Sequence, residues 1–105
     1  MKEGLIPYDD SHFDVIWICL VLGGVTDRGM LKITIDEIRR TLRPGGLIFL
    51  VENTTGKISG SRWKFRSIRD YKRLFKFIEL QRLDSYIDCG ETISIMAGRY
   101  KQGLK

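Results

Sequence analysis

Residues 43–52 read RPGGLIFLVE, and this stretch determines how the rest of the chain is arranged. Pro44 has a fixed φ and no backbone N–H, and it disfavours the helical region for the residue before it, so a preceding helix must stop. The two glycines that follow allow backbone angles that are closed to other residues. Residues 47–51 are then apolar without a break, which is typical of a short strand buried on both faces of a sheet. The stretch therefore predicts a helix, a tight turn and an inner strand, in that order.

The segment before this stretch predicts a second strand and the helix. Residues 15–22 (VIWICLVL) are apolar and rich in β-branched side chains, and they end at Gly23 and Gly24, so we expect a second strand buried on both faces. Residues 30–42 place apolar side chains at helical spacing. These side chains are Leu31, Ile35, Ile38 and Leu42. Strand, helix and strand form a parallel βαβ unit, whose crossover should be right-handed.

The segment after the inner strand predicts a long loop and a short helix. Residues 53–66 contain several glycines, serines and threonines and follow the carboxyl end of a parallel strand, where open α/β sheets place their ligands. A loop of this length is often a functional lid. Ser67 and Asp70 have the spacing of a capping box, which predicts a helix that begins there and ends near Glu79.

The last third of the chain predicts a hairpin. Residues 80–87 and 92–100 resemble strands, and the turn residues at 88–91 join them by so short a link that they must be antiparallel. The predicted fold class is therefore α/β, with the element order β-α-β-α-β-β and a carboxyl-terminal antiparallel hairpin.

Composition limits the possible functions. With 105 residues, of which 43% are hydrophobic, the chain is one folded domain or part of one. Cys19 and Cys89 have no metal-binding spacing and suggest no disulfide framework, so we expect no metal site and a reducing, cytoplasmic location. The longest apolar run, residues 15–22, is too short to span a bilayer, and we expect no signal peptide and no membrane span.

Positive charge gathers in one part of the chain, although the net charge of +5 is modest. Residues 57–76 contain eight lysines and arginines against one acid, Asp70, with aromatic residues interleaved. One interpretation is a site for an anionic partner, such as a nucleic acid, a phosphorylated substrate or a membrane surface. The alternative, which we favour, is a solvated loop and helix face, so nucleic acid is not the expected partner.

Three segments together resemble a known family. Residues 6–27 (IPYDDSHFDVIWICLVLGGVTD), 37–52 (EIRRTLRPGGLIFLVE) and 65–75 (FRSIRDYKRLF) are similar, in order and spacing, to motifs of class I S-adenosylmethionine-dependent methyltransferases. The most similar group is methyltransferase type 11, typified by the quinone-biosynthesis enzymes. The resemblance implies a partial Rossmann-like methyltransferase sheet, S-adenosylmethionine as the cofactor and a small molecule as the methyl acceptor.

The chain also departs from this family. It contains no G-x-G-x-G turn, with which the family's backbone approaches the cofactor, and no preceding strand to bear one. We therefore expect residues 1–105 to be a single, partial methyltransferase domain that lacks the amino-terminal glycine-rich half and is inactive alone. The family places its first strand beside the one at 15–22, so this strand should be an exposed apolar edge. A complementing chain or a second copy could pair with that edge.

The resemblance also suggests site residues. In the family, the carboxyl end of the strand at 15–22 lines the cofactor pocket, which implies cofactor-binding roles for Ile18, Cys19 and Leu20; the alternative is that they are core. Many relatives have a histidine in the next loop, where this chain has two glycines, so no general base is predicted and the catalytic residues stay unknown. Glu52 faces the ligand side, but we favour a solvated strand end or a hydrogen bond to the lid.

Three functions remain open from the sequence. The favoured function is S-adenosylmethionine-dependent methyl transfer to a small molecule. The second is a non-catalytic interaction module that completes a sheet through the strand at 15–22. The third is a binder of anions or nucleic acid that uses residues 57–76.

Overall fold

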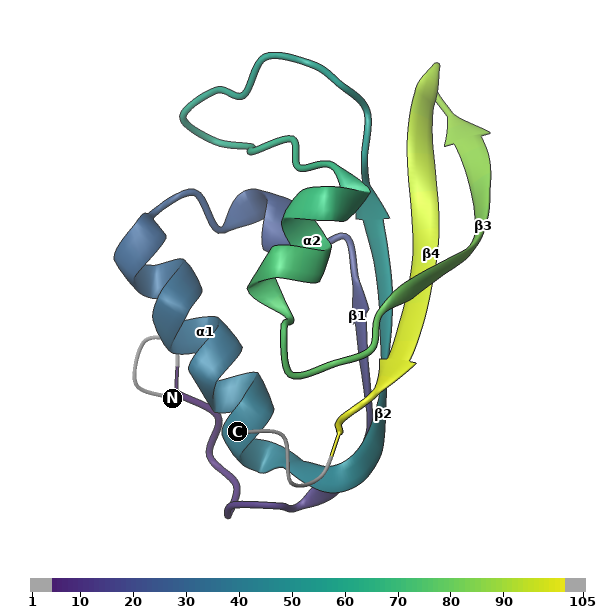
Figure 1. Ribbon diagram of the computed structural model, residues 1–105. Helices are drawn as coiled ribbons and strands as arrows, with labels where there is room; N and C mark the ends of the chain where they lie inside the picture. The colour runs from purple at the N-terminus through teal and green to yellow at the C-terminus, as the bar shows by residue number, and fades with distance from the viewer. Residues whose placement is uncertain (1–4, 102–105) are drawn as a thin grey trace.

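A computed structural model describes residues 5–101 of the chain. In chain order the elements are β1 (Phe13–Cys19), a 3-10 turn η1 (Leu22–Gly24), α1 (Arg28–Thr41), β2 (Leu42–Asn53), α2 (Ile68–Leu74), β3 (Gln81–Asp88) and β4 (Glu91–Arg99). The strands form one mixed sheet in the order β1-β2-β4-β3 (Figure 1). The predicted α/β class and the predicted order of helices and strands are confirmed.

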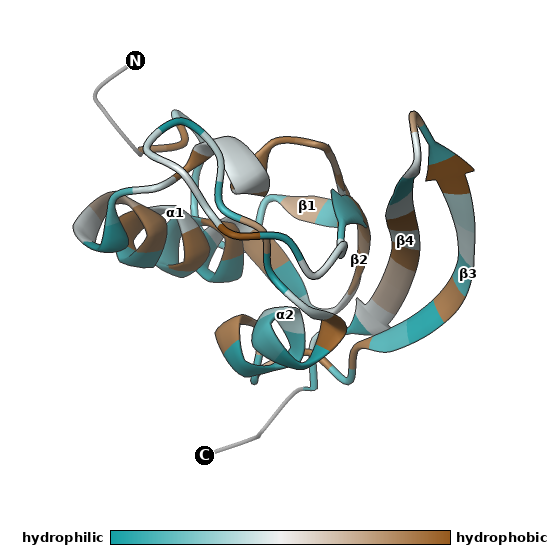
Figure 2. Cartoon of the chain, turned by 90° about the horizontal axis from the view of Figure 1, so that it is seen from above, coloured by the Kyte–Doolittle hydropathy of each residue, from teal (hydrophilic) through white to brown (hydrophobic). Residues whose placement is uncertain are grey.

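Strand pairing follows the predicted directions. β1 is parallel to β2, and β4 is antiparallel to both β2 and β3. Ile18 of β1, Leu50 of β2 and Met96 of β4 are aligned across the sheet, and all three are buried with α1 and α2 in one hydrophobic core. Both helices therefore cover the same face of the sheet, and the view from above in Figure 2 shows them on that side.

β1 is an edge strand, as predicted, but it is not buried on both faces. Val15 and Trp17 are 52% and 68% exposed, and Cys19 is also exposed. These side chains alternate with Ile18 and point away from the helices, and no described element covers that face. The expectation of a doubly buried strand was wrong because an apolar run specifies a strand but not the layers packed against it. The strand also ends at Cys19, three residues before the predicted end.

α1 begins at Arg28 because Asp27 caps it: the Asp27 carboxylate accepts a hydrogen bond from the Met30 N–H at 2.9 Å. The helix ends at Thr41, ahead of Pro44 as predicted. β2 begins directly at Leu42, so the expectation of a tight turn between the helix and the strand was wrong. Gly45 lies inside β2 with a left-handed φ of +80°, in the irregular stretch between the Phe13–Leu42 and Val15–Leu47 pairs.

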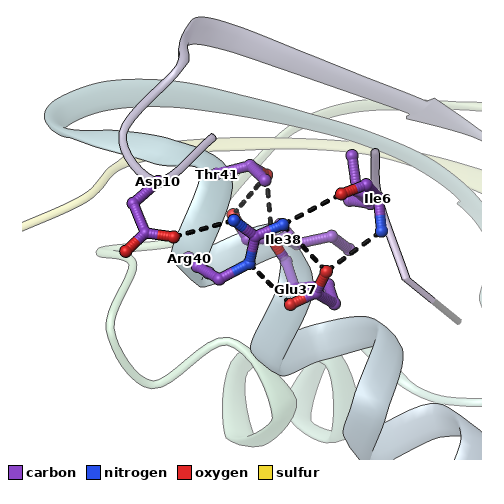
Figure 3. Close-up of polar contacts among 6 residues, drawn as sticks. All are labelled: Ile6, Asp10, Glu37, Ile38, Arg40 and Thr41. Carbon is purple, nitrogen blue, oxygen red and sulfur yellow. Dashed lines mark hydrogen bonds and ion pairs between the residues drawn. The ribbon is translucent and has the colours of Figure 1, made fainter. Parts of the chain in front are cut away.

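Polar contacts fix the amino-terminal segment to α1, as Figure 3 shows. The Arg40 guanidinium donates to the carboxylates of Glu37 and Asp10 at 2.7 Å each, and to the Ile6 carbonyl at 2.9 Å. Glu37 in turn accepts from the Ile6 N–H at 3.0 Å. The Arg40 hydrogen bond, followed by the one from Ile6, lowers the pKa of Glu37. This network sets the path of the chain into β1.

The capping box of α2 is confirmed: Ser67 accepts from the Asp70 N–H at 3.1 Å, and Asp70 accepts from the Ser67 N–H at 3.0 Å. The helix ends at Leu74, however, and not near Glu79. The cause is the sheet, because the Glu79 N–H donates to the Arg99 carbonyl at 3.2 Å and Ile78 forms a bridge with Tyr100. These pairings draw the backbone after α2 out of a helical path.

The hairpin between β3 and β4 is confirmed. Cys89 and Gly90 both have positive φ, 50° and 77°, which is the pattern of a type I′ turn. Because that turn matches the twist of antiparallel strands, Cys89 is a turn residue, as predicted.

Gly98 of β4 allows the chain after α2 to lie directly on the sheet. A Cβ at this position would stand 2.3 Å from the Glu79 carbonyl oxygen, whereas a Cβ at Gly56, in the loop, would meet nothing within 4 Å. We expect Gly98→Ala to lower the free energy of unfolding by about 1–3 kcal/mol. Gly56→Ala should change it by less than about 0.5 kcal/mol. Urea denaturation followed by circular dichroism measures both, and equal stabilities would contradict the close contact.

Candidate functional site

Three strands have termini at one end of the sheet, which is called the carboxyl edge below because β1 and β2 finish there. Antiparallel β4 starts at this same end. The loop of residues 54–67 arches over the same edge, between β2 and α2 (Figure 1). Ligands of open α/β sheets bind outside the carboxyl ends of the strands, so this edge is the candidate site.

The three predicted cofactor residues lie in different surroundings. Ile18 is 8% exposed and belongs to the core beneath the helices. Cys19 is exposed, so the alternative that it belongs to the core was wrong. Leu20 is 40% exposed and has a φ of +54°, while its N–H donates to the Val51 carbonyl at 2.7 Å. A ligand can therefore reach Cys19 and Leu20, and the cofactor role of all three residues stays a prediction.

Glu52, at the end of β2, is fully buried and binds the turn that follows β1. Its carboxylate accepts hydrogen bonds from the backbone N–H groups of Val21 and Leu22 at 3.1 Å each and of Gly23 at 3.4 Å. The expectation of a solvated strand end or a hydrogen bond to the lid was wrong. A turn with several unpaired N–H groups attracts a carboxylate, and only the parallel pairing of β1 and β2 brings Glu52 there.

Arg66 binds the opposite side of the same turn. Its guanidinium donates to the Leu22 carbonyl at 2.7 Å and to the Val25 carbonyl at 2.8 Å, and the side chain is only 5% exposed. Glu52 thus binds the N–H groups of residues 21–23, and Arg66 binds the carbonyls of Leu22 and Val25 in the same turn. This role was not predicted from the sequence, in which Arg66 was only one of the basic residues of the segment 57–76.

Burial changes the acid–base properties of this cluster. Desolvation raises the pKa of Glu52, opposed by the three N–H donors and by the positive charge of Arg66. Burial, and then the charge of Glu52, raises the pKa of Tyr71 on α2 to about 12. The Tyr71 phenol is therefore protonated at neutral pH.

The Trp63 side chain of the loop packs against Gly23 and Gly24. A Cβ at Gly23 would stand 2.2 Å from the Trp63 indole, so only glycine leaves room for the ring. The Lys64 N–H donates to the Gly23 carbonyl at 2.7 Å, and the Thr26 hydroxyl donates to the Ser61 carbonyl at 3.1 Å. The loop is therefore packed down on the turn in this structure.

The start of the loop is fixed to β4. The Asn53 side-chain amide donates to Glu91 at 2.7 Å, Lys57 forms an ion pair with the same carboxylate, and Thr54 shares a hydrogen bond with Ser94 at 2.7 Å. The Lys57 contact, followed by that of Asn53, lowers the pKa of Glu91. Lys57 and Arg66 are thus used within the protein, which reduces the basic segment available to an anionic partner.

Neither a metal centre nor a membrane-spanning helix is found in residues 5–101. In that range no group of three or more His, Cys, Asp or Glu side chains is placed to hold a metal ion. No helix of the described part is long and apolar enough to cross a membrane.

Comparison with known proteins identifies the family. A family model described as a methyltransferase domain matches residues 2–50. The ubiquinone/menaquinone biosynthesis C-methyltransferase UbiE of Shewanella piezotolerans is 33% identical over 90 residues, which are 84% of this chain and 34% of that protein. The malonyl-[acyl-carrier protein] O-methyltransferase of Nitrosospira multiformis is 29% identical over 96 residues, 90% of this chain and 30% of that one. The chain belongs to the methyltransferase family.

The solved structures show that the fold is shared. A structure titled SAM-dependent methyltransferase from Methanosarcina mazei has a TM-score of 0.76 and 16% identity, and the match covers 96% of this chain and 65% of that one. The Rossmann-like methyltransferase fold predicted from the sequence is confirmed. This member of the methyltransferase family spans about a third of the length of the curated relatives it matches.

The contact between Trp63 and the glycine pair can be tested by fluorescence in a Trp17→Phe background, where Trp63 is the sole tryptophan. We expect Gly23→Ala to displace the indole, shift its emission to longer wavelength and lower stability by about 1–3 kcal/mol. Gly24→Ala is the matched control, because its Cβ would lie at an ordinary 3.7 Å from the ring. Identical spectra for the two variants would contradict the packing.

The buried carboxylate predicts a pH dependence. Because the pKa of Glu52 is raised in the folded state, its protonated form favours folding, and its contribution to stability is lost as the pH rises from about 4.5 through the raised value. The stability of the natural chain relative to Glu52→Gln should therefore fall over that range. Urea denaturation at pH 4.5 to 7.5 measures the difference, in which the shifts of Glu37 and Glu91 cancel. If the natural chain instead became more stable relative to Glu52→Gln as the pH rises, the raised pKa of Glu52 would be refuted.

Proposed function

We propose that residues 1–105 are the carboxyl-terminal part of a single methyltransferase domain, which uses S-adenosylmethionine to methylate a small molecule in the cytoplasm. Membership of the family supports methyl transfer, and the fold shared with a SAM-dependent enzyme supports the cofactor. The observation on which the proposal mainly rests is the exposed pair Cys19 and Leu20, at the carboxyl end of β1 beside a turn fixed by Glu52 and Arg66.

The residues present fit one wall of a cofactor site. Leu20 offers an apolar side chain in a left-handed backbone conformation, and the turn after it is fixed from both sides. A glycine-rich G-x-G-x-G turn, which would form the other wall, is not among the 105 residues. We therefore propose that this chain alone is inactive, and that the complete site needs further polypeptide.

Methyl transfer requires mainly that the protein position the two reactants. S-adenosylmethionine, when bound, supplies a methyl group that is already activated for transfer. The protein must align an acceptor with that methyl group and exclude water. In this chain the fixed turn of residues 21–25 would provide alignment, and Trp63 on the loop would shield the site. No general base is assigned.

A second candidate function is an interaction module. It is favoured by β1, which is the sheet's edge and exposes Val15 and Trp17 on its uncovered face. A second copy or a complementing chain that pairs with β1 would protect both the edge and this apolar surface. Such pairing is compatible with the methyltransferase proposal, because a complementing chain could also supply the missing cofactor wall.

Calorimetric titration with S-adenosylmethionine tests the main proposal. The 105-residue chain alone should show no micromolar binding. A chimera in which residues 1–105 replace the matching segment of the Shewanella piezotolerans enzyme should bind. Leu20→Asn, which tolerates the left-handed conformation but removes the apolar side chain, should weaken binding by about tenfold.

The matched control is Leu83→Asn on β3, since Leu83 is also exposed, at 60%, but lies away from the site. Micromolar binding by the chain alone would contradict the incomplete pocket. A folded chimera without affinity for the cofactor, or one equally weakened by both substitutions, would contradict the role of Leu20.

A further inference from the structure

A groove lies between the loop of residues 54–67 and the β3–β4 turn. Its volume is about 290 Å³, at the lower end of the range for small-ligand sites. Leu20 lines it from the end of β1, and Cys89 lines it from the turn. The groove therefore lies at the carboxyl ends of β1 and β2, where the candidate site is, and it is separate from the hydrophobic core.

Aromatic and apolar side chains form much of the lining. Trp63 and Phe65 come from the loop, Leu20 follows β1, and Ile93 belongs to β4. Trp63 cannot withdraw toward the sheet without moving the turn, because its indole already rests on Gly23. Phe65 is fixed through its N–H, which donates to the Ser59 hydroxyl at 2.9 Å. These walls suit a flat apolar ring.

The charged lining is acidic, in contrast to the basic chain as a whole. Asp88 and Glu91 are the ionisable carboxylates of the groove, and no lysine or arginine lines it. Glu91 is already bound to Lys57 and Asn53, so its charge is partly compensated. Asp88 is exposed and makes no ion pair within residues 5–101. A carboxylate and two aromatic rings in one groove are the groups that bind an organic cation.

We propose that this groove binds a single-ring compound bearing a protonated amine, with the ring against Trp63 and Phe65 and the ammonium group near Asp88. The aromatic side chains of the groove favour a ring, and its acidic side chains favour a cation over an anion. The identification of this ligand as the methyl acceptor rests on the proposed function, whereas binding in the groove does not.

Fluorescence titration of the full 105-residue chain tests the proposal, in the Trp17→Phe background where Trp63 reports alone. The probes are phenethylamine, phenol and phenylacetate, which share a ring and differ in charge. We expect saturable quenching, with phenethylamine binding about tenfold more tightly than phenylacetate, as one cation–π contact and one exposed ion pair allow.

Asp88→Asn should remove most of this preference while phenol binds as before. Asp84→Asn is the matched control, because Asp84 is also an exposed acid of β3 but does not line the groove. Equal affinities for the three probes, or an equal effect of the two substitutions, would overturn the proposal, as would the absence of saturable quenching.

The outcomes also separate this inference from the proposed function. If the chimera fails to bind S-adenosylmethionine but the amine preference depends on Asp88, the groove is supported and the proposed function fails. If the chimera binds the cofactor and the probes do not bind, only the groove proposal is overturned.

Discussion

The candidate site depends on the buried carboxylate of Glu52 and its contacts with the turn after β1. Three backbone N–H groups of residues 21–23 converge on it, and Arg66 binds carbonyls of the same turn. Burial of this carboxylate is opposed by its three backbone hydrogen bonds and by the positive charge of Arg66, although desolvation outweighs both and raises its pKa. The turn is thus fixed relative to β2, so the exposed end of β1 has a defined position.

Two glycines adapt the backbone to the elements that pack on it. Gly23 gives room for the Trp63 indole, which brings the loop of residues 54–67 down onto the turn. Gly98 lets the chain after α2 pass close to β4, which ends that helix at Leu74. In both cases a missing side chain permits a close contact, so these positions control where the loop and α2 lie relative to the strand edge.

The helices cover one face of the sheet, and the opposite face is open at β1. The helices bury the side of Ile18, Leu50 and Met96, whereas Val15 and Trp17 remain exposed on the opposite side of β1. An apolar edge strand of this kind is normally protected in a folded protein. The relatives are about three times as long as the segment that matches this chain.

Sequence patterns were sufficient to predict the local elements: the stop before Pro44, the capping box of Ser67 and Asp70, the hairpin at Cys89, and the parallel βαβ unit. These follow from backbone angles and periodicity within a few residues, and motifs at matching spacing were enough to indicate the family. Three features became clear only from the folded structure: Glu52 and Arg66 bind one turn, Cys19 is exposed, and α2 ends five residues early. Each of these depends on groups about 20 or more residues apart in the chain, or on which layers cover a strand, and local sequence patterns contain neither.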